Sequence, residues 1–126
     1  MTIARFRAGA LAASVLVFPA LAACSSDGGS SENATAVAVT STADACELSA
    51  TTAPAGPVTF TVRNDGNETT EFYVYEEDGT TIVSEVENIG PGTSRELSVD
   101  LEAGTYETAC KPGQAGDGIR GDFTVS

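Results

Sequence analysis

The sequence contains no histidine, no tryptophan and only one methionine, which is the initiator. The missing imidazole excludes a catalytic triad, a histidine general base, a zinc site of the HExxH type and a two-histidine copper site. Basic residues are also scarce, since 6 Lys and Arg stand against 18 Asp and Glu and the net charge is −12. Because nucleic acids are bound through clustered Lys and Arg, this balance predicts that nucleic acid is not a partner.

The first 23 residues have the layout of a secretory leader. Arg5 and Arg7 precede an apolar stretch that is too short for a membrane span. The tetrad Leu21-Ala22-Ala23-Cys24 then resembles the bacterial lipobox, in which the cysteine is acylated and becomes the new N-terminus. We therefore expect residues 1–23 to be a lipoprotein signal peptide and Cys24 to be the lipidated residue that anchors the chain in a membrane.

Residues 24–35 are rich in Ser, Gly, Asp and Asn. They have too little apolar content to pack, so we expect a flexible, lipid-anchored tether before one folded domain at residues 36–126. Export and the lipid anchor predict a location outside the cytoplasm, at the outer face of the cell membrane or in the periplasm.

From residue 36 on, β-branched and aromatic residues recur in short runs, and no window has a sustained helical period. In Val58–Arg63, for example, apolar residues alternate with polar ones, as in a strand with one buried face. Asp78-Gly79 is the clearest hairpin signal. The pattern predicts an all-β fold, an antiparallel sandwich of Greek-key type. We expect about eight strands, near residues 36–40, 46–51, 58–63, 71–75, 81–86, 95–100, 105–110 and 121–125.

Once Cys24 is lipidated, Cys46 and Cys110 are the two remaining cysteines. Outside the cytoplasm such a pair favours a disulfide. The alternative is that one or both thiolates bind a metal ion, and the two interpretations exclude each other at any one moment because a disulfide sulfur is a poor ligand. Lys111 and Arg120 either lower the thiol pKa of Cys110 or pair with nearby aspartates.

The C-terminal part of the chain has a strand that ends in Cys110, a Lys-Pro-Gly turn, a polar loop and a closing strand at residues 121–125. This order resembles the ligand loop of cupredoxins, in which His and Met follow the cysteine and bind copper. Here Glu71 and Gln114 stand near the places of the two histidines, and Asp117 stands near the place of the methionine. No blue-copper site is therefore expected.

Four motifs occur in the order Cys46-Glu47, Glu71-Phe72-Tyr73-Val74-Tyr75, the run from Glu85 to Gly92, and Cys110-Lys111-Pro112-Gly113. Together they are similar to the cupredoxin-like domain of EfeO, a component of a bacterial iron-uptake system. The resemblance covers about residues 36–126 and implies binding of iron or copper ions. It implies a metal-ligand set of cysteines and acidic residues: Cys46, Glu71, Glu85, Glu87, Cys110 and Asp117. Since full-length members usually carry an imelysin-like domain, the implied partners are an iron-uptake permease or an imelysin-like protein.

Glu85 and Glu87 are two residues apart in an expected strand, so their side chains leave the same face with Cα atoms about 7 Å apart. Carboxylates suit hard cations such as Fe³⁺, whereas thiolates favour Cu⁺, Zn²⁺ or Fe²⁺. The alternative interpretation is that the pair only forms the solvated face of a strand.

These observations predict an extracytoplasmic, lipid-anchored metal-binding protein of cupredoxin-like fold that serves uptake or homeostasis of iron or copper. We expect a binding protein and not an enzyme, because the sequence shows no acid and base pair that supports turnover. The alternative is a structural or adhesive, disulfide-bonded β-sandwich lipoprotein without metal, whose acidity serves solubility.

Overall fold

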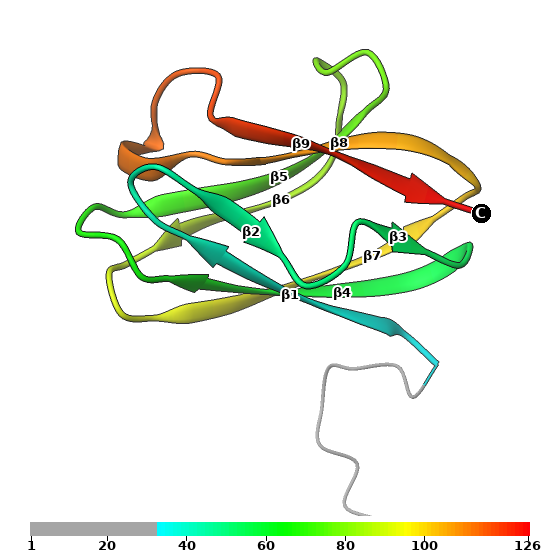
Figure 1. Cartoon of the computed structure of the whole chain (residues 1–126), viewed down its shortest axis with the longest axis horizontal. Coiled ribbons are helices and arrows are strands. Elements are labelled where there is room, and N and C mark those ends of the chain that lie inside the picture. The colour runs from blue at the N-terminus through cyan, green and yellow to red at the C-terminus, as the bar shows by residue number, and fades with distance from the viewer. Residues whose placement is uncertain (1–32) are drawn as a thin grey trace, which may run out of the picture.

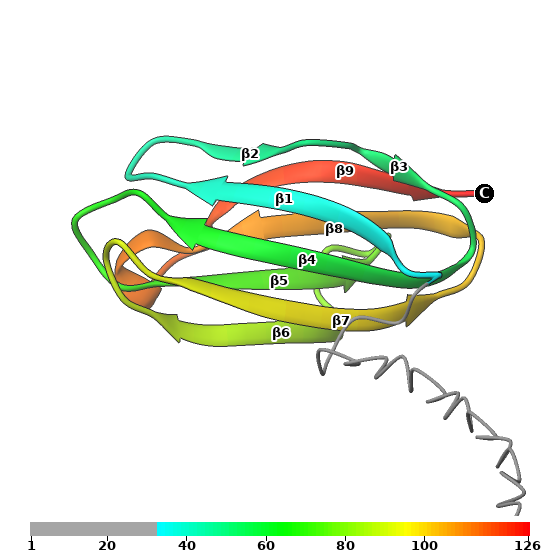
Figure 2. The same cartoon turned by 90° about the horizontal axis from the view of Figure 1, so that it is seen from below.

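The computed structural model describes residues 33–126, which form two packed β-sheets (Figures 1 and 2). The expected signal peptide, Cys24 and most of the expected tether lie outside the described residues. Within residues 33–126 no helix is long and apolar enough to cross a membrane. The elements are β1 (Thr35–Ser41), β2 (Cys46–Leu48), β3 (Thr52–Ala53), β4 (Gly56–Asn64), β5 (Thr70–Glu76), β6 (Ile82–Ile89), β7 (Ser94–Leu101), β8 (Gly104–Cys110), the 3₁₀ turn η1 (Pro112–Gln114) and β9 (Ile119–Val125).

One sheet has the strand order β2-β1-β4-β7 and the other has the order β3-β9-β8-β5-β6. The all-β sandwich is confirmed, but the expectation of purely antiparallel sheets is wrong. Strand β1 runs parallel to β4, and β3 runs parallel to β9. Side chains alternate between the two faces in both kinds of ladder, so the hydrophobic pattern of a strand does not reveal the direction of its neighbour.

Only residues 46–48 of the strand expected at residues 46–51 form a strand, and the chain then crosses to the other sheet. β2 ends at Leu48 and pairs with β1, whereas β3 pairs with β9 on the opposite sheet. Ser49 forms the corner between them. Its N–H donates to the carbonyl of Ala38 (2.8 Å), and its hydroxyl accepts from the N–H of Ala38 (2.9 Å). These two bonds follow the end of β2, and the chain then crosses to the five-stranded sheet.

The core between the sheets is built around Phe60 of β4, Phe72 of β5 and Phe123 of β9, which are all fully buried. The ring centroid of Phe60 lies 5.2 Å from that of Phe72 and 5.3 Å from that of Phe123, in tilted and edge-on arrangements. Each such side chain contributes roughly 1.5–3 kcal/mol by burial. The alternation expected in β4 is confirmed, because Val58 and Val62 are buried on the same face as Phe60.

The expected hairpin at Asp78-Gly79 is confirmed as the connection between β5 and β6. Gly79 has a φ of +67°, a backbone conformation that favours glycine. The carboxylate of Asp78 accepts hydrogen bonds from the Thr81 hydroxyl (2.6 Å) and from the N–H groups of Thr80 and Thr81 (both 2.8 Å). These bonds, the one from the Thr81 hydroxyl first, lower the pKa of Asp78 from 3.8 to about 2.

Four loops gather at one end of the sandwich, on the left of both views: β1–β2, β4–β5, β6–β7 and β8–β9 (Figures 1 and 2). The disulfide between Cys46 and Cys110 joins the start of β2 to the end of β8 and thereby ties one sheet to the other. The Cα atoms are 5.5 Å apart, and Cys110 is fully buried. The disulfide that the sequence favoured is therefore present in the structure.

Removing this disulfide should lower the free energy of unfolding by about 4 kcal/mol, because the cross-link restricts a long loop of the unfolded chain. Urea unfolding of the Cys46→Ala, Cys110→Ala double variant beside the oxidised protein measures this loss. A dithiol reductant should bring the wild-type protein to the value of the variant and leave the variant unchanged. A loss below about 1 kcal/mol would contradict the expected stabilisation.

Candidate metal-binding face

The outer face of the five-stranded sheet carries two stacked tyrosines. Tyr73 and Tyr75 of β5 point away from the core and pack with Ala109 of β8, whereas Phe72 and Val74 of the same strand point into the core. The tyrosine ring centroids are 5.5 Å apart, with an interplanar angle of 9°. Their side chains are nevertheless buried, with only 7% of Tyr73 and 4% of Tyr75 exposed. β5 therefore packs on both faces.

Two cations cover the tyrosines from the solvent side. The Nζ atom of Lys111 lies 4.2 Å from the ring centroid of Tyr73, and the guanidinium carbon of Arg120 lies 4.6 Å from that of Tyr75. Such cation–π contacts contribute about 0.5–2 kcal/mol each. Arg120 also forms an ion pair with Glu107 of β8. The expected pairing of Arg120 with a nearby aspartate side chain is therefore wrong, because the antiparallel neighbour β8 presents a glutamate to it.

Three of the expected metal ligands, Glu71, Glu85 and Glu87, lie around Tyr73. The phenol O–H of Tyr73 donates to Oε2 of Glu71 (2.9 Å). Glu85 stands directly opposite Tyr73 in the antiparallel ladder of β5 and β6, and Glu87 follows on the same side, beyond the buried Val86. Burial raises the pKa of Tyr73, and the hydrogen bond to Glu71 and the charges of Glu71, Glu85 and Glu87 raise it further. One sheet face thus brings Glu71 of β5 together with Glu85 and Glu87 of β6.

The other expected ligands do not join this face. Cys46 and Cys110 are linked in the disulfide and offer no thiolate in this state. Asp117 is exposed in the loop between η1 and β9, where its carbonyl accepts a hydrogen bond of 2.7 Å from Nε of Arg120. Within residues 33–126 no three Asp, Glu, Cys or His side chains are close enough together to hold a metal ion as they stand. Any coordination by Glu71 and its neighbours on β6 therefore requires their side chains to rotate.

Two residues in left-handed backbone conformations connect the β8–β9 loop to β6. Gln114 has a φ of +55° and Asn88 has a φ of +58°. The side-chain amide of Gln114 donates to Oδ1 of Asn88 (2.9 Å). The N–H of Lys111 donates to the carbonyl of Glu71 (2.9 Å), so the same loop is also tied to β5. Sequence reasoning missed Asn88, and the tolerance of asparagine for positive φ is the only local signal for it.

The family described as a cupredoxin-like domain matches residues 11–125. The iron uptake system component EfeO of Yersinia pseudotuberculosis is 34% identical over 110 residues, which are 87% of this chain and 28% of that protein. The EfeO of Escherichia coli strain K12 is 34% identical over 74 residues, 59% of this chain and 19% of that protein. The chain therefore spans less than a third of the length of the curated relatives it matches.

Among solved structures, dithionite-reduced auracyanin from Roseiflexus castenholzii superposes with a TM-score of 0.60 at 20% identity, over 74% of this chain and 98% of that one. Auracyanin A, a blue copper protein from Chloroflexus aurantiacus, superposes with a TM-score of 0.53 at 16% identity, over 73% of this chain and 98% of that one. At these identities the similarity shows the fold, and it confirms the expected cupredoxin-like sandwich.

The glycines of the β8–β9 loop offer a matched test of its packing. A Cβ atom on Gly118 (φ +81°) would lie 2.7 Å from the carbonyl oxygen of Cys110, whereas one on Gly116 (φ +77°) would meet nothing within 4 Å. Gly116→Ala should lower the free energy of unfolding by about 1–2 kcal/mol, from the left-handed backbone alone. Gly118→Ala should lower it by about 2–4 kcal/mol, because overpacking is added. Urea unfolding of both variants measures the difference, and equal losses would contradict the close packing.

The electrostatic link between Glu71 and Tyr73 can be measured by titration. In a Tyr75→Phe, Tyr106→Phe background, Tyr73 is the only tyrosine left, and its ionisation is followed by ultraviolet absorbance. Glu71→Gln should lower the pKa of Tyr73, because the negative charge is lost and an amide oxygen is a weaker acceptor than a carboxylate. The pKa should stay above its ordinary value of 10.0, since burial is the main cause of the shift. The control Glu96→Gln, on the other sheet, should have no effect, and a pKa that Glu71→Gln leaves unchanged would refute the link.

Proposed function

The chain belongs to the cupredoxin-like domain family, and on that premise we propose that it is an extracytoplasmic protein that captures iron ions through carboxylate ligands. One observation carries the proposal: Glu71, Glu85 and Glu87 lie on one sheet face around the hydroxyl of Tyr73. The similarity to EfeO proteins, which are named as components of iron uptake systems, supports the same role. Iron is the cargo of the protein in this proposal.

The chemistry of the donor set favours ferric iron. Glutamate carboxylates are hard ligands and suit Fe³⁺, whereas thiolate and imidazole suit copper. The sequence has no histidine, and the disulfide removes Cys46 and Cys110 as thiolate donors while it is intact. We therefore propose Fe³⁺ as the main cargo and copper as the alternative, with no blue-copper site.

The proposed capture is reversible. Glu85 and Glu87 are exposed, so their side chains are free to turn toward an ion beside the half-buried Glu71. Ordering each of these long side chains costs up to about 2 kcal/mol, which limits the affinity. Tyr73 holds Glu71 in place by its hydrogen bond. Lys111, which lies over the ring of Tyr73, supplies a positive charge that offsets part of the repulsion between the carboxylates.

The proposed location is outside the cytoplasm, at the outer face of the cell membrane or in the periplasm. Leu21-Ala22-Ala23-Cys24 would be the cleavage and lipidation site, so that the lipid on Cys24 holds the domain at a membrane. The disulfide supports this location, because such bonds persist in oxidising compartments. An iron-uptake permease or an imelysin-like protein would take the ion from this module. The proposed role is binding and delivery of the ion, without turnover of a substrate.

The proposal is tested by neutralising the three carboxylates together. The Glu71→Gln, Glu85→Gln, Glu87→Gln variant should bind Fe³⁺ at least about tenfold more weakly than the wild-type protein, because the charged oxygen ligands are lost. Fe³⁺ is supplied as its citrate complex to keep it in solution. Binding is measured as protein-bound iron by mass spectrometry after rapid desalting, with a thiol count on the same sample.

The matched control removes the same charge elsewhere. The Glu96→Gln, Asp100→Asn, Glu102→Gln variant changes three exposed carboxylates of β7 and the turn after it. It should retain the affinity of the wild-type protein within about twofold, because distant exposed charges are screened. Equal weakening in both variants would show only unspecific attraction to an acidic protein. Absence of iron binding in the wild-type protein would support the metal-free structural or adhesive sandwich instead.

A further inference from the structure

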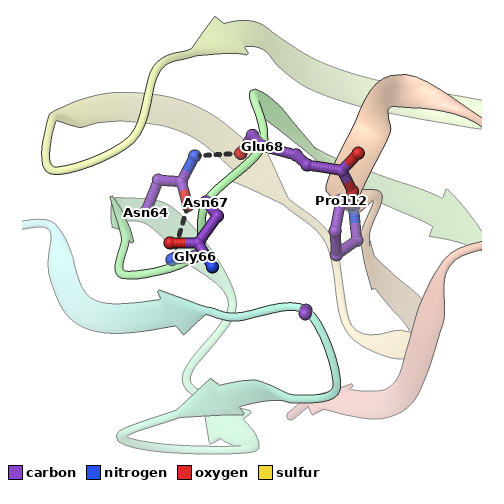
Figure 3. Close-up of a pocket in the computed structure, with 6 residues that line it drawn as sticks. Asn64, Gly66, Asn67, Glu68 and Pro112 are labelled. Atoms are coloured by element: carbon purple, nitrogen blue, oxygen red, sulfur yellow. Dashed lines mark hydrogen bonds between the residues drawn. The ribbon is translucent and has the colours of Figure 1, made fainter.

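The loop end of the sandwich contains a cavity of about 210 Å³, separate from the tyrosine face (Figure 3). Pockets for drug-sized ligands usually measure roughly 300–1,000 Å³, so this cavity has the size for a single side chain. Three loops supply its walls. The lining residues are Ala43 from β1–β2, Asn64, Gly66, Asn67 and Glu68 from the end of β4 and the loop after it, and Pro112 from η1.

The walls of the cavity are held in shape by Asn64, which is almost fully buried. Its Nδ2 group donates to the carbonyls of Glu68 (2.7 Å) and Ile89 (2.8 Å), and its Oδ1 accepts from the N–H of Gly66 (2.9 Å). Figure 3 shows the bonds to Glu68 and Gly66. The polar atoms of this side chain are thus engaged within the wall. The cavity is therefore preformed, which lowers the entropy cost of filling it.

Two exposed side chains at the cavity, those of Asn67 and Glu68, carry oxygen atoms of the kind that accept hydrogen bonds. The side chain of Glu68 extends toward Pro112 (Figure 3), and a Cβ atom on Gly113 would lie 3.2 Å from its Oε2. Within residues 33–126 the carboxylate of Glu68 has neither a hydrogen bond nor an ion pair, and the side-chain amide of Asn67 has no hydrogen bond. None of the lining residues is basic, and Ala43 adds apolar surface.

We propose that this cavity receives a basic side chain, an arginine, from a partner protein that docks on the loop end. A guanidinium group forms paired hydrogen bonds with a carboxylate such as that of Glu68, and its alkyl stem packs on apolar walls. The net charge of −12 attracts a basic partner and repels both a second copy of this chain and an anionic lipid surface. The proposal does not depend on iron binding, since none of the three carboxylates on the tyrosine face lines the cavity.

The cavity lies near the proposed iron site, so a docked partner could also contact that site. Pro112, in its wall, directly follows Lys111, and the N–H of Lys111 donates to the carbonyl of Glu71. A partner that docks on the cavity would therefore lie beside β5, the strand that contains Glu71.

The test uses a short Gly and Lys peptide with one central arginine, titrated into the ¹⁵N-labelled full chain at low salt. The peptide should shift the amide resonances of Ala43, Gly66, Asn67, Glu68 and Gly113. Replacing the arginine by citrulline, which has the same shape without the charge, should weaken binding about tenfold. Capped arginine alone should bind about tenfold more weakly than the peptide, because the acidic surface also attracts the lysines.

Glu68→Gln should weaken the binding of the arginine peptide about tenfold, whereas the control Glu96→Gln should change the affinity for this peptide by less than about twofold. Equal binding of the arginine and citrulline peptides, or an unchanged affinity of Glu68→Gln, overturns the proposal. Resonance shifts spread over β7 point to unspecific attraction and overturn it as well. Capped arginine that binds as tightly as the peptide identifies a small-molecule pocket and refutes docking of a partner.

Discussion

The covalent link between Cys46 and Cys110 is the constraint on which the loop end of this molecule depends. It joins β2 of one sheet to β8 of the other, at the residue where the β8–β9 loop begins. That loop then bonds to β5 through Lys111 and to β6 through Gln114. Because both cysteine sulfurs are bound in the disulfide, the metal ligands that remain nearby are oxygen atoms. The bond that links the two sheets would therefore also narrow the choice of metal at the proposed iron site.

The two faces of β5 pack in different clusters. Phe72 and Val74 face the common core, while Tyr73 and Tyr75 build a second, smaller cluster under Lys111 and Arg120. The tyrosine rings are buried, whereas Glu85 and Glu87 beside them are exposed. Exposed carboxylates above a packed support suit the proposed uptake and release of an ion.

Much of the fold was predictable from local patterns. The sequence predicted the approximate positions of most strands, because each signal acts within a few residues. These signals are the alternation in β4, the Asp78-Gly79 turn, and the Pro and Gly residues between the apolar runs. Two features were not predictable: the parallel pairing of β1 with β4, and the end of β2 at Leu48, after which β3 joins the other sheet. Both depend on which distant strand lies alongside, and the local pattern is the same for either neighbour.

The features of the candidate site were likewise predictable only in part. The sequence by itself determined the absence of imidazole, the excess of carboxylates and the two cysteines available for a disulfide, because composition sets which donor atoms exist. The tertiary structure alone decided that Glu71 lies with Glu85 and Glu87 around one tyrosine and that Asp117 stays apart. It also decided that Asn64 shapes a cavity beside Glu68. Strand register and loop contacts set these distances, and they arise only when segments far apart in the chain pack together.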